Sequence, residues 1–473
     1  MQIKAGLRCV SVWLGAGLLG LAGTGTGTGT GAAAPDAVRS QAREIFAHII
    51  GIESSIGEGK VPLVAKYLAE RFKAGGFPDA DIHILPLGET ASLVVRYRGN
   101  GRGGKPIALM AHMDVVTAKR SDWQRDPYTL IEENGFFYGR GTSDVKQEVA
   151  LLTSTFLRLK AEGFVPSRDL IIAFSGDEET AQATATDLVT AHRDLVDAEF
   201  ALNGDGGGGV LTEGTAKPLI YYVQGAEKSS AQFLLTTHNP GGHSSQPRSD
   251  NAIYELADAL KAVQRYEFPV MWNEWTLGDF KAASQVTPGA LGTAMARFAA
   301  DPGNAAAAAE MSKNPAFIGK VRTTCVATML AGGHAENALP QSATATINCR
   351  IFPGTSAADV QKTLQRLAGP KVDVRQGYDA LVSNASPMRD DVMRAVAKAV
   401  AASNPGAPVV PTQAAYATDG AVFRNAGIPT YGAGGVFIMN SEQFAHGLNE
   451  RIRVKEFYNG LTYWDVLIKA LAS

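Results

Sequence analysis

The chain has 473 residues, of which 45% are hydrophobic and 19% are charged, and its formal net charge is −2. This composition is that of a globular protein and excludes a disordered or fibrous chain. The small net charge provides no long-range attraction for nucleic acid or for an acidic membrane surface, so we expect neither as a partner. A chain of this length exceeds the usual single hydrophobic core, which predicts two domains.

Residues 1–34 are predicted to form an export signal followed by a spacer. Lys4 and Arg8 supply a positive end, an apolar core occupies residues 10–21, and small residues follow it. A membrane-spanning helix needs about 20 apolar residues, so a cleaved signal is favoured over an uncleaved anchor. The Gly-Thr alternation over residues 23–31 cannot build a core. We therefore expect an exported protein, periplasmic or secreted, without stable membrane insertion.

From residue 35 to about residue 223, helical and strand patterns alternate. Helical spacing of apolar residues covers residues 36–77, and a second strong helical pattern runs through Val149, Leu152, Phe156 and Leu159. The predicted strands lie at residues 82–87, 92–97, 106–116, 170–174 and 198–202. Strands that alternate with helices predict an α/β fold, with a mostly parallel sheet covered by helices on both faces.

The pattern changes at about residue 224. Residues 229–237 and 344–351 alternate apolar and polar side chains, as half-exposed antiparallel strands do. A helical segment at residues 252–263 and an Ala-rich segment at residues 305–309 lie between them. We therefore predict a smaller inserted α+β domain over residues 224–382. The first domain, residues 35–223, is expected to resume at residues 383–473.

Acidic and histidine side chains follow several of the predicted strands. His112 and Asp114 end the strand at residues 106–116, in which side chains two residues apart point to the same side. Similar positions hold Asp144, Glu178, Glu179 and Asp205, and a late loop holds His446. These residues should meet, because the carboxyl ends of the strands form the crevice of an open α/β sheet. Carboxylates that lie close together repel one another, and two divalent ions bound among them would remove this repulsion. Such ions would also favour the ionisation of a bound water molecule.

Several segments resemble the motifs of the dinuclear-zinc family of aminoacylase, carboxypeptidase G and succinyl-diaminopimelate desuccinylase. The matching segments are residues 111–115 (Ala-His-Met-Asp-Val), 139–146 (Gly-Arg-Gly-Thr-Ser-Asp-Val-Lys), 177–179 (Asp-Glu-Glu) and 445–447 (Ala-His-Gly). The resemblance runs from about Ala42 to the C-terminus. It implies a zinc exopeptidase-like catalytic domain with two Zn²⁺ per subunit, which Co²⁺ or Mn²⁺ could replace.

The resemblance also implies the metal ligands. His112 and Asp205 would bind one zinc, Glu179 and His446 would bind the other, and Asp144 would bridge the two ions. The zincs would polarise the scissile carbonyl.

Other roles follow from the same resemblance. Asp114 would support the ligands, and Glu178 would be the general base that passes a proton from water to the leaving nitrogen. The inserted domain would be a lid that commonly dimerises, so His243 would stabilise the oxyanion in the partner's active site. Asn337 and Arg350 would contact substrate, with Arg350 suited to a carboxylate. Arg350 could instead pair across its own sheet.

This sequence leaves some assignments open. Gln147 stands where the family usually has Gly, which affects the start of a helix more than the ligands. Glu213 is an alternative to Asp205 as a ligand, and His238 is an alternative to His243. Export would also permit a disulfide between the two cysteines that follow the signal, at positions 325 and 349.

We therefore expect an exported dinuclear-zinc hydrolase that cuts amide bonds of small peptides or N-acyl amino acids beside a free carboxylate. It would act as a carboxypeptidase, dipeptidase or N-acyl-amino-acid hydrolase, and as a homodimer through the lid. One alternative is an aminopeptidase with a similar zinc site, against which the inserted domain with His243 argues. The other is a non-catalytic binding protein of the same fold, against which the intact ligands and Glu178 argue.

Overall fold

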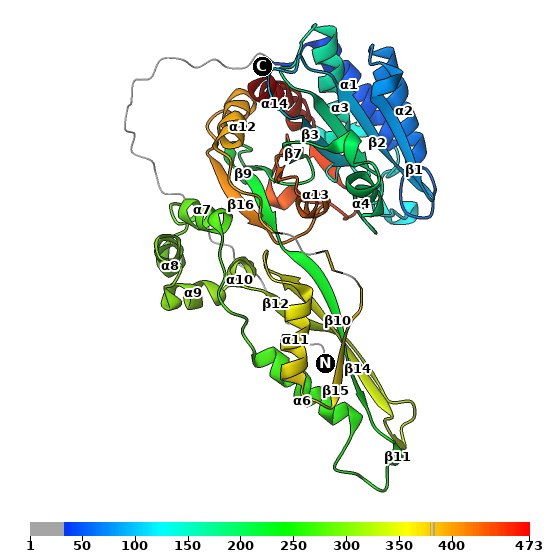
Figure 1. The fold of residues 1–473 in the computed structure, drawn as a ribbon, viewed down its shortest axis with the longest axis vertical. Coiled ribbons are helices and arrows are strands. Elements are labelled where there is room, and N and C mark those ends of the chain that lie inside the picture. The colour runs from blue at the N-terminus through cyan, green and yellow to red at the C-terminus, as the bar shows by residue number, and fades with distance from the viewer. Residues whose placement is uncertain (1–32, 379, 382–383) are drawn as a thin grey trace, which may run out of the picture.

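A computed structural model describes residues 33–378, 380–381 and 384–473 of the chain. It shows two bodies, one built on a large sheet and one, more elongated, built on a smaller sheet (Figure 1). The predicted export signal lies outside the described residues. Within those residues, no helix combines the length and the apolar character that crossing a membrane requires.

In the part of the chain that the structure describes, the large sheet has ten strands. They are β1 Ile82–Leu87, β2 Thr90–Tyr97, β3 Ile107–His112, β6 Leu170–Ser175, β7 Phe200–Asn203, β8 Gly208–Leu211, β9 Pro218–Glu227, β16 Val409–Ala414, β17 Thr430–Gly432 and β18 Phe437–Ile438. Their order is β1-β2-β6-β3-β7-β17-β9-β8-β18, with β16 beside β9. The central strands β6, β3, β7 and β17 run parallel, and antiparallel pairs flank them. The predicted mostly parallel sheet is confirmed, although it is mixed.

Helices cover both faces of this sheet, which explains why β3 is buried along its whole length. Leu109 packs in one core and Met110, the next residue, packs in the other. The first face carries α1 Asp36–Ile50, α2 Val61–Ala74, α3 Lys146–Ala161, α12 Asp390–Ser403 and α14 Val454–Ala472. The second face carries α4 Ala183–Thr190, α5 Arg193–Val196 and α13 Gly420–Asn425. The helical pattern predicted over residues 36–77 corresponds to two helices, α1 and α2, and Gly57 and Gly59 adopt positive φ in the segment between them.

The second body contains an antiparallel sheet in the order β12-β14-β10-β15. Its strands are β10 Ser229–His238, β12 Thr324–Gly332, β14 Ser342–Ile351 and β15 Val372–Gln376, and α6 Ala252–Arg265 and α11 Ala357–Ala368 pack on it. A small ribbon of β11 Gly242–His243 and β13 Ala338–Leu339 lies at the end farthest from the large sheet (Figure 1). Cys325 and Cys349 form a disulfide between β12 and β14, which the sequence alone left open.

Part of the predicted inserted segment packs with the large sheet instead. Four helices follow α6, namely α7 Glu274–Ala283, α8 Gly289–Ala300, α9 Ala305–Ser312 and α10 Pro315–Val321. Of these described helices, α7 packs on β16 and β9. Trp275 of α7 is fully buried in the core of the large sheet, and its indole N–H donates to the carbonyl of Ser386 at 2.7 Å. Strand β9 also continues to Glu227, past the boundary expected at residue 223.

Candidate metal centre

A first group of possible ligands meets at the end of β3. The chain places His112 as the last residue of this strand and fully buries its ring. Its Nε2 lies 3.2 Å from Asp144 Oδ1 and 3.9 Å from Asp205 Oδ2. Asp205 lies two residues after the end of β7, the parallel neighbour of β3. The carboxyl ends of adjacent parallel strands therefore bring His112 and Asp205 together, as the sequence pattern predicts.

A second group shares Asp144 with the first. His446 Nε2 lies 3.0 Å from Asp144 Oδ2 and 2.9 Å from Glu179 Oε1. Among the described residues, ligand atoms of His112, Asp144 and Asp205 lie within 4.8 Å of one another, and so do those of Asp144, Glu179 and His446. Asp144 thus offers one carboxylate oxygen to each group. This arrangement suits two cations bridged by one carboxylate.

The loops that carry Asp144 and His446 are tied together by a buried ion pair. Arg140 Nη1 donates to Glu450 Oε2 at 2.6 Å, and Arg140 Nη2 donates to the carbonyls of His446 and Gly447. The Glu450 carboxylate also accepts the backbone N–H groups of Gly141, Ser143 and Asp144. His446 adopts a left-handed φ of 62°, a conformation that a non-glycine residue keeps only where its surroundings hold it.

Asp114 positions the turn that carries Glu178 and Glu179. Its two carboxylate oxygens accept the backbone N–H groups of these residues, each at 3.1 Å. Its backbone carbonyl lies 3.0 Å from Nδ1 of His112. An imidazole that is held through one nitrogen presents the other in a fixed direction.

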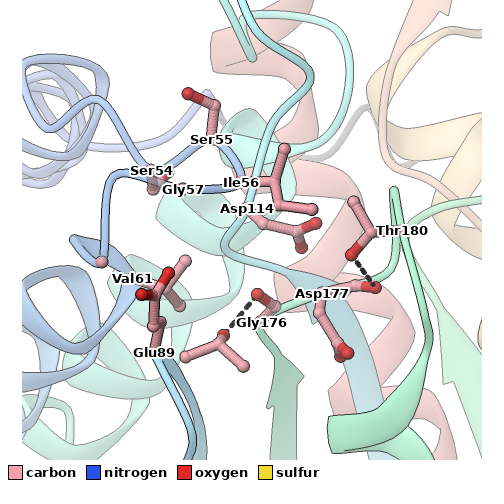
Figure 2. Close-up of a pocket in the computed structure, with 12 residues that line it drawn as sticks. Ser54, Ser55, Ile56, Gly57, Val61, Glu89, Asp114, Gly176, Asp177 and Thr180 are labelled. Atoms are coloured by element: carbon pink, nitrogen blue, oxygen red, sulfur yellow. Dashed lines mark hydrogen bonds between the residues drawn. The ribbon is translucent and has the colours of Figure 1, made fainter.

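A small cavity of about 170 Å³ lies beside Asp114 (Figure 2). The hydrogen bond from the Thr180 hydroxyl to the Asp177 carbonyl, drawn there, closes the turn of Glu178 and Glu179. Residues 54–57 also line the cavity, but none of the residues of the two ligand groups does. This cavity is therefore separate from the candidate metal centre.

The pKa values of the clustered side chains indicate that bound cations would stabilise their carboxylate forms. Burial, reinforced by the Glu178 carboxylate, raises the pKa of Asp205 well above its ordinary value. Burial also raises the pKa of Glu179, with a further increase from Asp144. The hydrogen bond with Asp144 raises the pKa of His446 to about 9. Carboxylate oxygen and imidazole nitrogen are common ligands of divalent metals such as zinc, so the residues present fit two such ions.

Glu178 lies beside the ligands without belonging to either group that contains Asp144. Burial raises the pKa of Glu178 to about 9. Cations placed among the neighbouring ligands would favour its carboxylate form, in which it can accept a proton. Its Oε1 accepts a hydrogen bond from Gln182 at 3.3 Å. The side chain is therefore held and placed next to the metal centre.

Two cavities meet at Glu178 and Glu179. One, of about 400 Å³, contains Asp144, Asp205 and His446, and the other, of about 750 Å³, contains Arg350. Both cavities include Glu178 and Glu179 in their walls. Arg350 is exposed, and it forms no ion pair within the described part of the chain, so the cross-sheet pairing considered for it is absent there.

His243 and Asn337 do not reach the metal centre of their own chain. They lie together in the β11–β13 ribbon, where the backbone N–H of Ser244 donates to the carbonyl of Asn337 at 3.0 Å. This ribbon is at the opposite end of the molecule from the large sheet (Figure 1). The alternative residues are not in the ligand groups either: Glu213 accepts from Ser441, and His238 is exposed at the end of β10.

The sequence pattern did not single out Glu450 or Arg140. Glu450 is buried, and it shares a loop with His446, so an acidic residue shortly after the last histidine motif was the available signal. The small strands β5 Phe136–Tyr138 and β19 Arg451–Arg453 pair, with Arg451 opposite Tyr138. This pairing brings the start of the loop that carries Asp144 next to the end of the loop that carries His446. The sequence alone could not show this pairing.

Comparisons with known proteins agree with this fold and site. The family model described as "Peptidase family M20/M25/M40" matches residues 108–470 of the chain. The chain is 25% identical over 399 residues to the N-fatty-acyl-amino acid synthase/hydrolase PM20D1 of Homo sapiens, covering 80% of this chain and 77% of that protein.

Solved structures share the fold. The M20 family metallo-carboxypeptidase Sso-CP2 from Sulfolobus solfataricus superposes with a TM-score of 0.68 at 16% identity, covering 91% of this chain and 99% of that one. The Bacillus subtilis YXEP protein, described as a dinuclear metal binding peptidase, superposes with a TM-score of 0.59 at 12% identity. The match covers 92% of this chain and 98% of that one. The chain belongs to peptidase family M20/M25/M40, which confirms the resemblance seen in its motifs. It is therefore a hydrolase of amide or peptide C–N bonds.

We predict that Glu450→Gln lowers both stability and metal content. The change leaves the buried Arg140 without its carboxylate and places an amide N–H₂ among donors, which should lower the free energy of unfolding by about 3–5 kcal/mol. Urea denaturation and metal analysis of the purified protein would measure the two effects. Glu162→Gln, which removes a half-exposed partner of Lys469, is the control and should cost at most about 1 kcal/mol. Equal behaviour of the two variants would contradict the role of Glu450.

Proposed function

We propose that the protein is an exported dinuclear-zinc hydrolase of small peptides or N-acyl amino acids that have a free carboxylate. It would act as a carboxypeptidase, dipeptidase or N-acyl-amino-acid hydrolase. One observation carries this proposal: the candidate metal centre and Arg350, which forms no ion pair with the described residues, lie in adjoining cavities that share Glu178 and Glu179. A substrate that spans both cavities can place its amide at the first and its carboxylate at the second.

The two ligand groups support the following metal-binding roles. His112 and Asp205 would hold one zinc, Glu179 and His446 would hold the other, and Asp144 would contact both. When bound, the ions would polarise the scissile carbonyl and make water more acidic. Asp114 would keep the imidazole of His112 and the Glu178–Glu179 turn in register, because it contacts all of them.

Glu178 would move the proton. Its carboxylate would accept the proton of the attacking water and donate it to the nitrogen of the leaving amine, which departs as a neutral amine. Gln182 holds the carboxylate in place, and the backbone of Glu178 is fixed by Asp114. Arg350 would pair with the carboxylate of the substrate through its planar guanidinium.

His243 would serve a second copy of the chain. A lone chain holds this residue at the far tip, exposed, with Nδ1 2.8 Å from the Ser245 hydroxyl. Strand β12 offers a means of pairing, because it is an edge strand whose Val326, Met329 and Leu330 are more than half exposed. Unpaired strand edges with exposed apolar side chains associate with further strands. We therefore infer a homodimer through the second body.

Export is supported by the disulfide. Cys325 and Cys349 are bridged, and such bonds persist in oxidising compartments such as the periplasm or the exterior of the cell. The predicted signal at residues 1–34 is consistent with this location.

We predict that Glu178→Ala strongly lowers turnover but keeps both metal ions. Loss of the proton carrier should lower kcat by about 10²–10⁴-fold, since that is the usual contribution of a general base. A panel of dipeptides and N-acyl amino acids, blocked or free at either end, would be assayed beside metal analysis. Full activity in this variant with both ions present would contradict the mechanism. Activity on substrates with a blocked carboxylate and a free amine would favour an aminopeptidase instead.

A mixing experiment tests the exchange of His243 between chains. His243→Ala and Glu178→Ala should each be inactive as pure dimers, because every site lacks one residue. In an equal mixture, half of the dimers are mixed and each contains one complete site, so activity should return to about a quarter of the wild-type value. Equal metal content in all samples is the control. No recovery in a mixture shown to contain mixed dimers would contradict the proposal.

A further inference from the structure

Three large, exposed side chains with apolar rings or chains line the cavity that contains Arg350. Tyr378 is 44% exposed, Leu381 is 36% exposed and Tyr416 is 51% exposed. All three border the same cavity of about 750 Å³. Single exposed apolar residues need no explanation, but several in one cavity provide contact area for an apolar group. Tyr378 follows β15 in the second body, whereas Tyr416 follows β16 in the large sheet, so both bodies form this surface.

The second body places Tyr378 beside Arg350. Arg350 on β14 lies opposite Ser230 on β10, and opposite residues of antiparallel strands have Cβ atoms about 4.5–5.5 Å apart. The Ser230 hydroxyl lies 2.9 Å from the Tyr378 hydroxyl and forms a hydrogen bond with it. Arg350 and Tyr378 are therefore both neighbours of Ser230, and both line one cavity.

This pairing matches the chemistry of an α-amino acid. Its carboxylate and its side chain are attached to the same carbon, so a carboxylate on Arg350 brings the side chain to the residues around Arg350. Among its described residues, the second body supplies no acidic side chain to this wall. Glu178 and Glu179 also line the cavity, but both are assigned roles at the metal centre, so a basic side chain would find no other described carboxylate as a partner. An acidic side chain would compete with the substrate's own carboxylate for Arg350. An apolar side chain suits the surface because burial of apolar area is favourable.

We propose that this cavity selects substrates whose leaving amine is an α-amino acid with a large apolar side chain, such as leucine or phenylalanine. Tyr378, Leu381 and Tyr416 are the specificity-determining contacts, and they act on the side chain next to the carboxylate. The inference rests on the proposed hydrolysis beside a free carboxylate, and it adds which amino acid is released.

The test compares N-acetyl-L-leucine and N-acetyl-L-phenylalanine with N-acetylglycine, N-acetyl-L-lysine and N-acetyl-L-aspartate as substrates of the metal-loaded protein. The kcat/KM for the leucine and phenylalanine substrates should exceed that for the glycine substrate by about 10–100-fold. Leu381→Ala should reduce the preference for leucine over glycine by about 5–10-fold. Leu219→Ala changes a similarly exposed leucine of β9 that lies outside this cavity, and it should leave the preference unchanged. A preference that Leu381→Ala leaves intact would overturn the assignment.

A binding measurement separates this inference from the proposed function. Calorimetric titration of the metal-loaded Glu178→Ala protein with L-leucine and with glycine should show tighter binding of leucine. Turnover of all substrates at equal kcat/KM would overturn the selectivity while leaving the hydrolase proposal intact. Absence of turnover in the wild type with both metals bound would contradict the hydrolase proposal. In that case, tighter binding of leucine would still support the pocket, and equal or absent binding would overturn it.

Discussion

The buried ion pair between Arg140 and Glu450 fixes the geometry on which the metal centre depends. Both side chains are almost completely inaccessible to solvent, and taking two charges out of water is unfavourable by itself. The cost is offset because the Glu450 carboxylate accepts several backbone N–H groups and Arg140 donates to two backbone carbonyls. Those backbone groups belong to the loops of Asp144 and His446. Ligands from distant parts of the sequence thereby share one rigid support.

The large sheet and the second body divide the proposed reaction between them. The body built on the large sheet supplies all the candidate ligands and Glu178. His112, Glu178, Glu179 and Asp205 lie at or just after the carboxyl ends of parallel strands, and Asp144 and His446 lie on loops. The second body supplies Arg350 to the same chain's cavity and carries His243 to a tip that its own chain cannot use. The helix α7, with Trp275 buried in the sheet, anchors the second body close to the point where β9 leads into β10. The proposed complete site thus depends on how the two bodies, and the two chains of the proposed dimer, are held.

Much of the site could be predicted from sequence because its residues end regular elements. His112 ends an apolar strand, and Asp205 follows another. Because both residues lie at the carboxyl ends of predicted strands, the sequence pattern could place them at one edge of the sheet. Asp114 lies beyond the end of β3, and it contacts His112 through the turn that follows, where the sequence pattern had extended the strand. Glu450 was missed because it acts by accepting hydrogen bonds from backbone N–H groups. Such hydrogen bonds leave no periodic pattern in the sequence. The packing of α7 on the large sheet was missed because, among the buried residues of this helix, only Trp275 belongs to the core of that sheet.

The central claim is that two metal ions occupy the cluster and share Asp144. Diffraction at the zinc absorption edge from crystals of the metal-loaded protein would locate the ions directly. The account predicts two anomalous peaks per chain, one in contact with His112 and Asp205 and the other in contact with Glu179 and His446, with Asp144 touching both. A single peak, or two peaks of which only one contacts Asp144, would contradict it.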